Sequence, residues 1–262
     1  MVSPLSHRKN TLFIILSGIF LTNAIVAELI GVKIFSLEGT LGLSPAQIPL
    51  LGDFVLDFNL AAGVVIWPVV FITTDIINEY YGKRGVQLIS LFTVACISYV
   101  FVVIYVVTEL SPADFWLQVN SQDADGQPFD IDFAFDKVYL QGLGIIIGSL
   151  VAFMVGQLLD VIIFHRLRRL TGKGKIWLRA TGSTLVSQLI DSYVVLFIAF
   201  YVFGNWPIEQ VAAVGIVNYT YKFVVALAVT PLLYVAHYFI DRYLGKETAE
   251  QLMEEASRDA AA

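Results

Sequence analysis

Residues 67–84 read WPVVFITTDIINEYYGKR, an apolar run that contains Asp75 and Glu79 and stops at a Lys-Arg pair. A carboxylate at the centre of a membrane-spanning helix costs roughly 2.5–3.5 kcal/mol, so acids there usually face a bundle interior or a watery cavity. Gln157-Leu-Leu-Asp160 and Gln188-Leu-Ile-Asp191 repeat this situation in two other apolar segments. The pattern is typical of a polar site inside a membrane.

The composition extends this interpretation to the whole chain. Of the 262 residues, 57% are hydrophobic and 15% charged, and the mean hydropathy is +0.75, which is too apolar for a soluble domain. Six stretches can cross a hydrocarbon core of about 30 Å, at about 11–31, 58–78, 87–108, 138–163, 181–203 and 211–239. We predict an all-α membrane protein, with a six-helix transmembrane domain over 1–243 and a cytoplasmic tail over 244–262.

Acidic and basic residues are sorted between the connections. The N-terminal segment, alternate connections and the tail carry the basic residues Arg8, Lys9, Lys83, Arg84, Arg166, Arg168, Arg169, Lys173, Lys175, Arg179, Arg242, Lys246 and Arg258. The other connections are acidic, notably 111–136. By the positive-inside rule, both termini are predicted to be cytoplasmic. No basic patch indicates a nucleic-acid partner.

The second predicted span carries polar residues on one face. Asp75 is eight residues from Lys83 and so lies roughly 12 Å inside the cytoplasmic boundary. Glu79 shares its helix face and Asn78 lies beside them. Glu79 could instead be an interfacial residue paired with Lys83. Trp67, near the same polar stripe in sequence, could stack on a planar ligand.

The fifth and sixth spans carry the deepest charges. Asp191 lies twelve residues beyond Arg179, roughly 18 Å by helix rise, on a stripe with Gln188. Lys222 is too deep to reach either surface, so it requires an acidic partner, and Asp191 is the first candidate. A structural ion pair without a ligand is the competing interpretation. An amide together with a carboxylate can bind a planar heterocycle that carries N–H and C=O groups.

These considerations give a set of candidate substrate-binding residues: Asn23, Trp67, Asp75, Asn78, Glu79, Gln157, Thr184, Ser187, Gln188, Asp191, Asn218 and Lys222. Asp160, six residues from Arg166, is expected to pair with the basic connection. No Ser-His-Asp constellation, metal-ligand spacing or phosphate loop is present in the sequence, so we expect no catalysis, metal or cofactor. An intramembrane hydrolase with Asp160 and Asp191 as its acid pair is an alternative, but the usual Gly-x-Gly-Asp context is missing.

Residues 68–82, with Asp75, Glu79, Tyr81 and Gly82, resemble the Pro-x6-Asp-x3-Glu-x-Tyr-Gly segment of the queuosine precursor transporter family, earlier described as vitamin uptake transporters. Two further segments resemble the fifth and sixth spans of the same family. They contain Arg179, Ser183, Thr184, Gln188 and Asp191, and then Lys222, Thr230, Pro231, Leu232 and Tyr234. The resemblance extends over about 11–243.

The resemblance implies a bacterial inner-membrane importer of 7-cyano-7-deazaguanine and 7-aminomethyl-7-deazaguanine, bases used in tRNA queuosine modification. It implies a bundle similar to the substrate-binding subunits of energy-coupling-factor transporters. The expected partners are a deazapurine base and the lipid bilayer, and homo-oligomers are left open. A substrate-binding subunit that depends on an ATPase module is the main alternative, because the sequence has no nucleotide-binding motif of its own.

Overall fold

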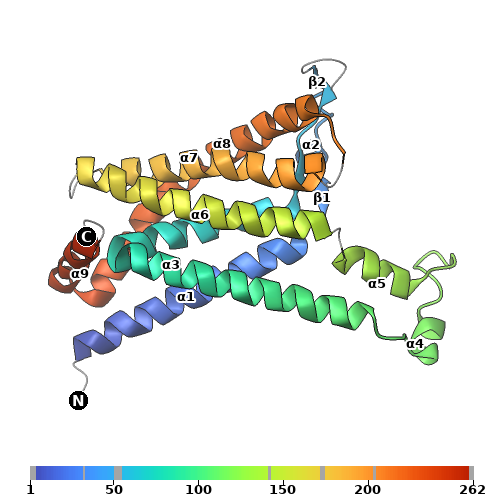
Figure 1. The fold of residues 1–262 in the computed structure, drawn as a ribbon, viewed down its shortest axis with the longest axis horizontal. Helices are drawn as coiled ribbons and strands as arrows, with labels where there is room; N and C mark the ends of the chain where they lie inside the picture. Colours follow the sequence, from blue (N-terminus) through green and yellow to red (C-terminus); the bar gives the residue numbers. More distant parts are fainter. Residues whose placement is uncertain are drawn as a thin grey trace.

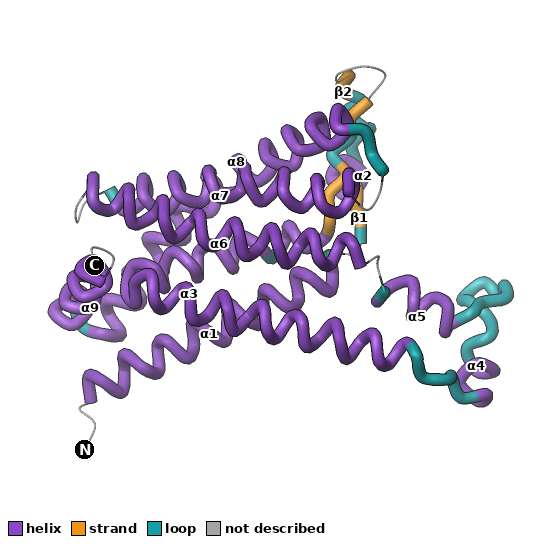
Figure 2. The backbone as a smooth tube through the Cα atoms, in the orientation of Figure 1, coloured by secondary structure: helices purple, strands orange, loops and turns teal. Residues whose placement is uncertain are grey.

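The computed structural model describes residues 4–31, 33–49, 55–140, 143–171, 175–202 and 205–259. The long helices are α1 (Pro4–Ile30), α3 (Trp67–Thr108), α6 (Leu143–Thr171), α7 (Ile176–Leu196) and α8 (Ile208–Leu244). They lie lengthwise beside one another (Figure 1), and helix dominates the backbone (Figure 2). α7 packs between α6 and α8, and α1 packs against α3. The predicted all-α fold is confirmed.

The distribution of side chains is that of a membrane protein. Large apolar side chains such as Ile14, Leu88 and Tyr238 are exposed on the outer faces, whereas Asn78 and Gln188 are buried. Lipid solvates the apolar faces, and polar groups are stabilised only inside the bundle. Among the described residues, five helical stretches are long and apolar enough to cross a membrane: His7–Ile30, Trp67–Thr108, Ile147–Thr171, Ala180–Val202 and Ile208–Leu244.

α3 reverses its direction part-way along its 42 residues. Gly82 has φ 69° and ψ −172°, which are not helical values and which glycine adopts readily because it has no Cβ. In Figure 1 the half of α3 before this break and the half after it run in opposite directions. The predicted second and third spans therefore fall on the two halves of α3. Whether each half crosses the membrane separately, to give six spans, stays a prediction.

The second span was predicted to begin at residue 58, but the α-helix begins only at Trp67. β4 (Asn59–Ala61) pairs antiparallel with β1 (Ile34–Ser36), and a 3-10 turn over Ala62–Val65 leads into α3. Pro68 lies in the first turn of α3, where its missing N–H costs nothing and its fixed φ favours a helix start. The helix therefore begins at Trp67.

Glu38 stabilises the segment that precedes α3. It belongs to the short helix α2 (Leu37–Thr40), next to a second strand pair, β2 (Ile48–Pro49) with β3 (Val55–Leu56). Its carboxylate accepts a hydrogen bond from the Phe58 backbone N–H at 2.7 Å. This bond to the charged form lowers the pKa of Glu38 below its ordinary value.

The connections gather at two ends of the bundle. α4 (Asp114–Val119) and α5 (Ile131–Tyr139) lie at the end away from both chain termini (Figure 1). The C-terminal end of α6 and the start of α7 lie at the end with the termini, where α9 (Lys246–Asp259) packs against α3. The two ends match the predicted separation of acidic from basic connections, and which end faces the cytoplasm stays a prediction.

Replacing Gly82 with Ala is expected to destabilise the protein by roughly 1–3 kcal/mol, because an L-residue is strained at this φ and ψ. A Cβ there would also lie 3.1 Å from the Ala256 carbonyl oxygen and 3.2 Å from the Ala256 Cα, so α9 would be displaced. Thermal unfolding in detergent measures the change. Gly18→Ala in α1 is the matched control, since a Cβ at Gly18 meets nothing within 4 Å. Equal stability of the two variants would contradict the role of Gly82.

Candidate functional site

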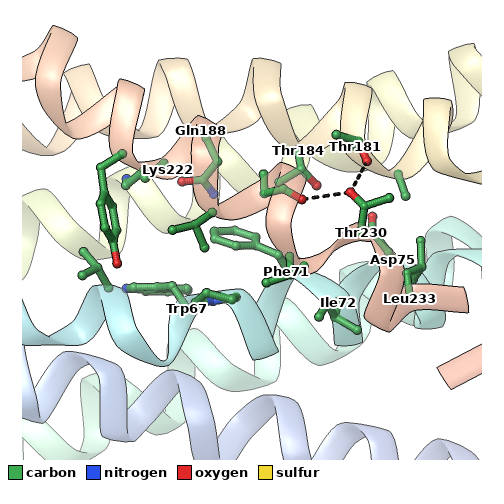
Figure 3. A pocket seen from close by; sticks show the side chains of 17 residues that line it. Trp67, Phe71, Ile72, Asp75, Thr181, Thr184, Gln188, Lys222, Thr230 and Leu233 are labelled. Carbon is green, nitrogen blue, oxygen red and sulfur yellow. Dashed lines mark hydrogen bonds between the residues drawn. The ribbon is translucent and has the colours of Figure 1, made fainter. Parts of the chain in front are cut away.

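A cavity lies between α3, α7 and α8 and contains about 600 Å³ of empty space, its open side included. Its wall is mostly apolar with a few separate polar groups, which is the usual composition of a small-molecule site. Figure 3 shows Gln188 and Lys222 toward one end of the cavity and Asp75 toward the other. The polar groups thus come from three helices that are distant in sequence.

Two aromatic side chains of α3, Trp67 and Phe71, stack on each other in this cavity. The ring centroids of Trp67 and Phe71 are 5.7 Å apart and the ring planes differ by 24°. Trp67 also contacts Phe153 of α6, with ring centroids 5.8 Å apart. Because these contacts hold the Trp67 ring in place, it can offer a preformed apolar face to a planar ligand.

The deepest predicted charges form an ion pair. Lys222 Nζ of α8 lies 2.5 Å from Asp191 Oδ2 of α7. The pairing predicted from their similar depths is therefore present. The side chains of Lys222 and Asp191 keep 18% and 23% of their surface exposed, so a ligand in the cavities can still contact them.

A second cavity, with about 340 Å³ of empty space, adjoins the first. The two cavities share Trp67, Phe71, Gln188 and Lys222. Of the candidate residues, those that line at least one cavity are Trp67, Asp75, Gln157, Thr184, Ser187, Gln188, Asp191 and Lys222. The fold therefore brings most of the predicted set together.

Asp160 also lines the second cavity, although its distance from Arg166 predicts pairing with the basic connection. It is 3% exposed and accepts a hydrogen bond from Ser187 Oγ of α7 at 3.3 Å. Among the described side chains, no cation lies within ion-pair distance of it. The repeated Gln-Leu-x-Asp pattern in the sequence had indicated that Asp160, like Asp191, belongs to a polar site inside the membrane.

Asn78 and Glu79 line neither of these two cavities. Glu79 Oε1 lies 3.5 Å from Arg168 Nη2 of α6, and both side chains are buried. Arg168 also donates to the backbone carbonyls of Asn78, Glu79 and Met253, the last in α9. Glu79 therefore pairs with Arg168. This ion pair lies near α9, away from the two cavities.

Asn23 and Asn218 also lie outside the lining of these cavities. Asn23 Nδ2 donates to the carbonyl oxygen of Ile19 in its own helix at 2.8 Å. Asn218 is half-buried on α8. Neither placement provides a contact with the cavity wall.

Sequence reasoning missed two contributors. Phe71 lines both cavities but has no feature that separates it from other apolar residues of α3. Glu28 lines neither cavity, but it accepts a hydrogen bond from Ser149 of α6 and so links α1 to α6. Glu28 was not among the predicted site residues, and the lone acid in an apolar segment was the available sequence signal.

Residues 61–236 match the profile of a protein family described as "Putative vitamin uptake transporter". The matched region contains every residue that lines the two cavities. The chain belongs to this family. Membership establishes a transporter that sits in a lipid bilayer, as the apolar helices require.

Three curated relatives extend the comparison. A "Probable queuosine precursor transporter" of Bacillus subtilis is 32% identical over 68% of this chain and 73% of its own length. A protein of the same description from Haemophilus influenzae is 28% identical over 65% of each chain. The "Queuosine precursor transporter" of Escherichia coli is 26% identical over 66% of this chain and 70% of its own. No solved structure matches the chain significantly.

Proposed function

We propose that this protein imports the queuosine precursors 7-cyano-7-deazaguanine and 7-aminomethyl-7-deazaguanine across the bacterial inner membrane. One observation carries the proposal: a cavity in which the aromatic surface of Trp67 and Phe71 adjoins an amide and an ion pair, Gln188 with Asp191–Lys222. The names of the three relatives support the same class of substrate.

The polar groups around the cavity complement the edge of such a base. A deazaguanine ring presents N–H donors and a carbonyl acceptor in one plane. Asp191 can accept from ring N–H groups, Lys222 can donate to the carbonyl, and the Gln188 amide can do either. Charge-assisted hydrogen bonds of this kind contribute about 1.5–3 kcal/mol each.

Transport moves the base unchanged in this proposal. Asp191 is held by Lys222 and acts as a binding group, so we assign it no catalytic step. The end of the bundle with both termini and the basic connections faces the cytoplasm, by the positive-inside rule. The base enters the cavity from the opposite end and leaves past the Asp75 end.

Uptake by the purified protein tests the function. Proteoliposomes should take up labelled 7-cyano-7-deazaguanine, and unlabelled 7-aminomethyl-7-deazaguanine should compete, whereas adenine should not. The same bases should raise the thermal stability of the protein in detergent, because a ligand that binds only the folded state stabilises it. Binding without uptake would favour a substrate-binding subunit that needs an ATPase module. Failure of both bases to bind or move would refute the proposal.

Trp67→Ala is expected to weaken binding of 7-cyano-7-deazaguanine by about tenfold, since stacking on one aromatic side chain is worth roughly 1–3 kcal/mol. Titration calorimetry or a ligand-dependent thermal shift measures the loss. Trp177→Ala is the matched control, because Trp177 is largely exposed and lines neither cavity. Equal affinities of the two variants would remove Trp67 from the site.

A further inference from the structure

Two carboxylates that the proposed binding mode does not pair with a cation lie close together inside the bundle. Asp75 of α3 is 7% exposed and lines the larger cavity, and Asp160 of α6 is 3% exposed and lines the smaller one. α3 packs against α6, and the two cavities adjoin because four residues line both of them. The two acids therefore occupy one polar region between α3 and α6.

The cations of the interior contact other acids. Arg168 pairs with Glu79, and Lys222 pairs with Asp191. Within the described part of the chain, no cationic side chain lies within ion-pair distance of Asp75 or Asp160. The titratable or charged groups on the surrounding helices include Glu28 of α1, Glu79, Tyr80, Tyr81 and Lys83 of α3, His165 and Arg168 of α6, Asp191 of α7, and Tyr221, Lys222, His237 and Asp241 of α8, of which Tyr221 lines the larger cavity with Asp75.

Several buried oxygen atoms in the same region have no hydrogen-bond donor among the described groups. Asp75 Oδ1, Gln157 Oε1 and Gln188 Oε1 are inaccessible to solvent and accept no hydrogen bond from any described group. All three residues line the two cavities. Asp160 accepts a hydrogen bond from the Ser187 hydroxyl of α7. These unsatisfied oxygens and the two carboxylates can each accept a hydrogen bond from a protonated group, and the unsatisfied Asn78 Nδ2 lies on the same helix as Asp75.

The smallest cation that satisfies this region is a proton. Two carboxylates that share a buried site do not both ionise, because each charge disfavours the other and burial disfavours both. Among the described residues, no group of His, Cys, Asp and Glu side chains has the arrangement of a multidentate metal site. A proton on one of the two carboxyl groups neutralises half of their combined charge without any further ligand.

We propose that Asp75 and Asp160 form a proton-binding pair that couples import of the base to the entry of one proton. The pair takes a proton from the outer solution when the cavities open outward, and releases it to the cytoplasm when they open inward. No other bond forms or breaks. With both acids ionised, the empty bundle would have to close over two unpaired negative charges, so protonation permits the change of conformation. This inference rests on the proposed function for the identity of the transported base.

A pH gradient across proteoliposomes tests the coupling. One unit of pH is a tenfold ratio of proton activity, so one proton per base permits accumulation up to about tenfold per unit. With the outside one unit more acidic, the protein is expected to concentrate labelled 7-cyano-7-deazaguanine about three- to tenfold, until a protonophore collapses the gradient. A dye inside the vesicles should report acidification that depends on the base. Uptake that only equilibrates the base under this gradient would overturn the proposal.

The variant Asp160→Asn distinguishes loss of proton coupling from loss of base binding. This variant is expected to let the base move down its own gradient but to lose accumulation driven by pH. Asp114→Asn is the matched control, an identical substitution at an exposed acid of α4, and should accumulate base as the unmodified protein does. Accumulation by Asp160→Asn equal to that of the control would overturn the assignment. Accumulation driven by a sodium gradient at equal pH would overturn it in favour of sodium.

A spectroscopic measurement keeps the proton site testable even if the base is not the substrate. The infrared spectrum of the purified protein at neutral pH should contain the carbonyl stretch of a protonated, buried carboxylic acid. That band should disappear or shift in both Asp75→Asn and Asp160→Asn and persist in Asp114→Asn. Absence of the band from the unmodified protein would overturn the proton pair, whatever the uptake experiments show. Failure of uptake with the band present would instead refute the proposed function.

Discussion

Asp191→Asn is expected to abolish uptake of 7-cyano-7-deazaguanine while the protein still inserts into the membrane. The substitution keeps the size of the side chain but removes the charge that pairs with Lys222 and that accepts from the ring N–H groups of the base. Loss of one charge-assisted bond of about 1.5–3 kcal/mol lowers affinity by about tenfold or more. Uptake by cells, with membrane insertion followed by immunoblot, measures the effect. Near-normal uptake would exclude Asp191 from the site.

A double-mutant cycle separates the binding role of this pair from its structural role. Lys222→Met should destabilise the bundle, because removal of one partner leaves a carboxylate in the interior, a change that costs about 3–5 kcal/mol for fully buried pairs. The double variant Asp191→Asn with Lys222→Met should recover stability but not uptake. Additive losses of stability would show that the two residues do not interact.

The exposed ion pair Lys9–Glu255 provides the control for this cycle. Its N–O distance is 3.2 Å, but its side chains are 39% and 68% exposed. Solvent screens such a pair, so the cycle with Lys9→Met and Glu255→Gln should give a coupling of only about 0–1 kcal/mol. A coupling as large as that of Asp191 with Lys222 would mean that burial does not set the strength of either pair.

Arg168→Met is expected to destabilise the protein by about 3–5 kcal/mol, the usual cost of breaking a buried ion pair. The guanidinium contacts the Glu79 carboxylate and donates to three backbone carbonyls, of which that of Met253, at 2.5 Å, belongs to α9. Its loss should therefore loosen α9 from α3 before the bundle unfolds. Thermal unfolding in detergent measures the stability, and limited proteolysis measures the release of α9.

Arg166→Met is the matched control on the same helix, because Arg166 is exposed. It should change stability by less than about 0.5 kcal/mol, as most surface substitutions do. If α9 is cleaved no faster in Arg168→Met than in Arg166→Met, Arg168 does not hold the C-terminal helix in place.

The sequence could predict much of the site because the membrane limits the alternatives. Counting helix rise from the basic connections places Asp191 and Lys222 at similar depths, and a lone charge at that depth is too costly to remain unpaired. Their ion pair follows from those two facts alone. Glu79 shows the limit of this reasoning, since the sequence offered a place in the binding site or a pairing with Lys83, and the observed partner is Arg168 of another helix.

The sequence by itself determined the membrane character and the all-α class. Apolar runs of about 20 residues are stable only as helices in lipid, where every backbone polar group must be satisfied within the segment. The sequence also predicted a connection between the spans 58–78 and 87–108, and the break that the structure has at Gly82 falls inside it. These properties depend on local chemistry and on the solvent, and both are readable without any contact between distant residues.

Only the tertiary structure decided which polar residues share a cavity. Asp160 faces Ser187 because α6 packs against α7 with that side inward, and no local signal records the rotation of one helix against another. Residues 59–61 form a strand that pairs with residues 34–36. For this reason the helix α3 does not extend upstream of Trp67. In each case the deciding free energy comes from contacts between segments that are far apart in the chain. The sequence around each residue therefore does not reveal which partner it will contact.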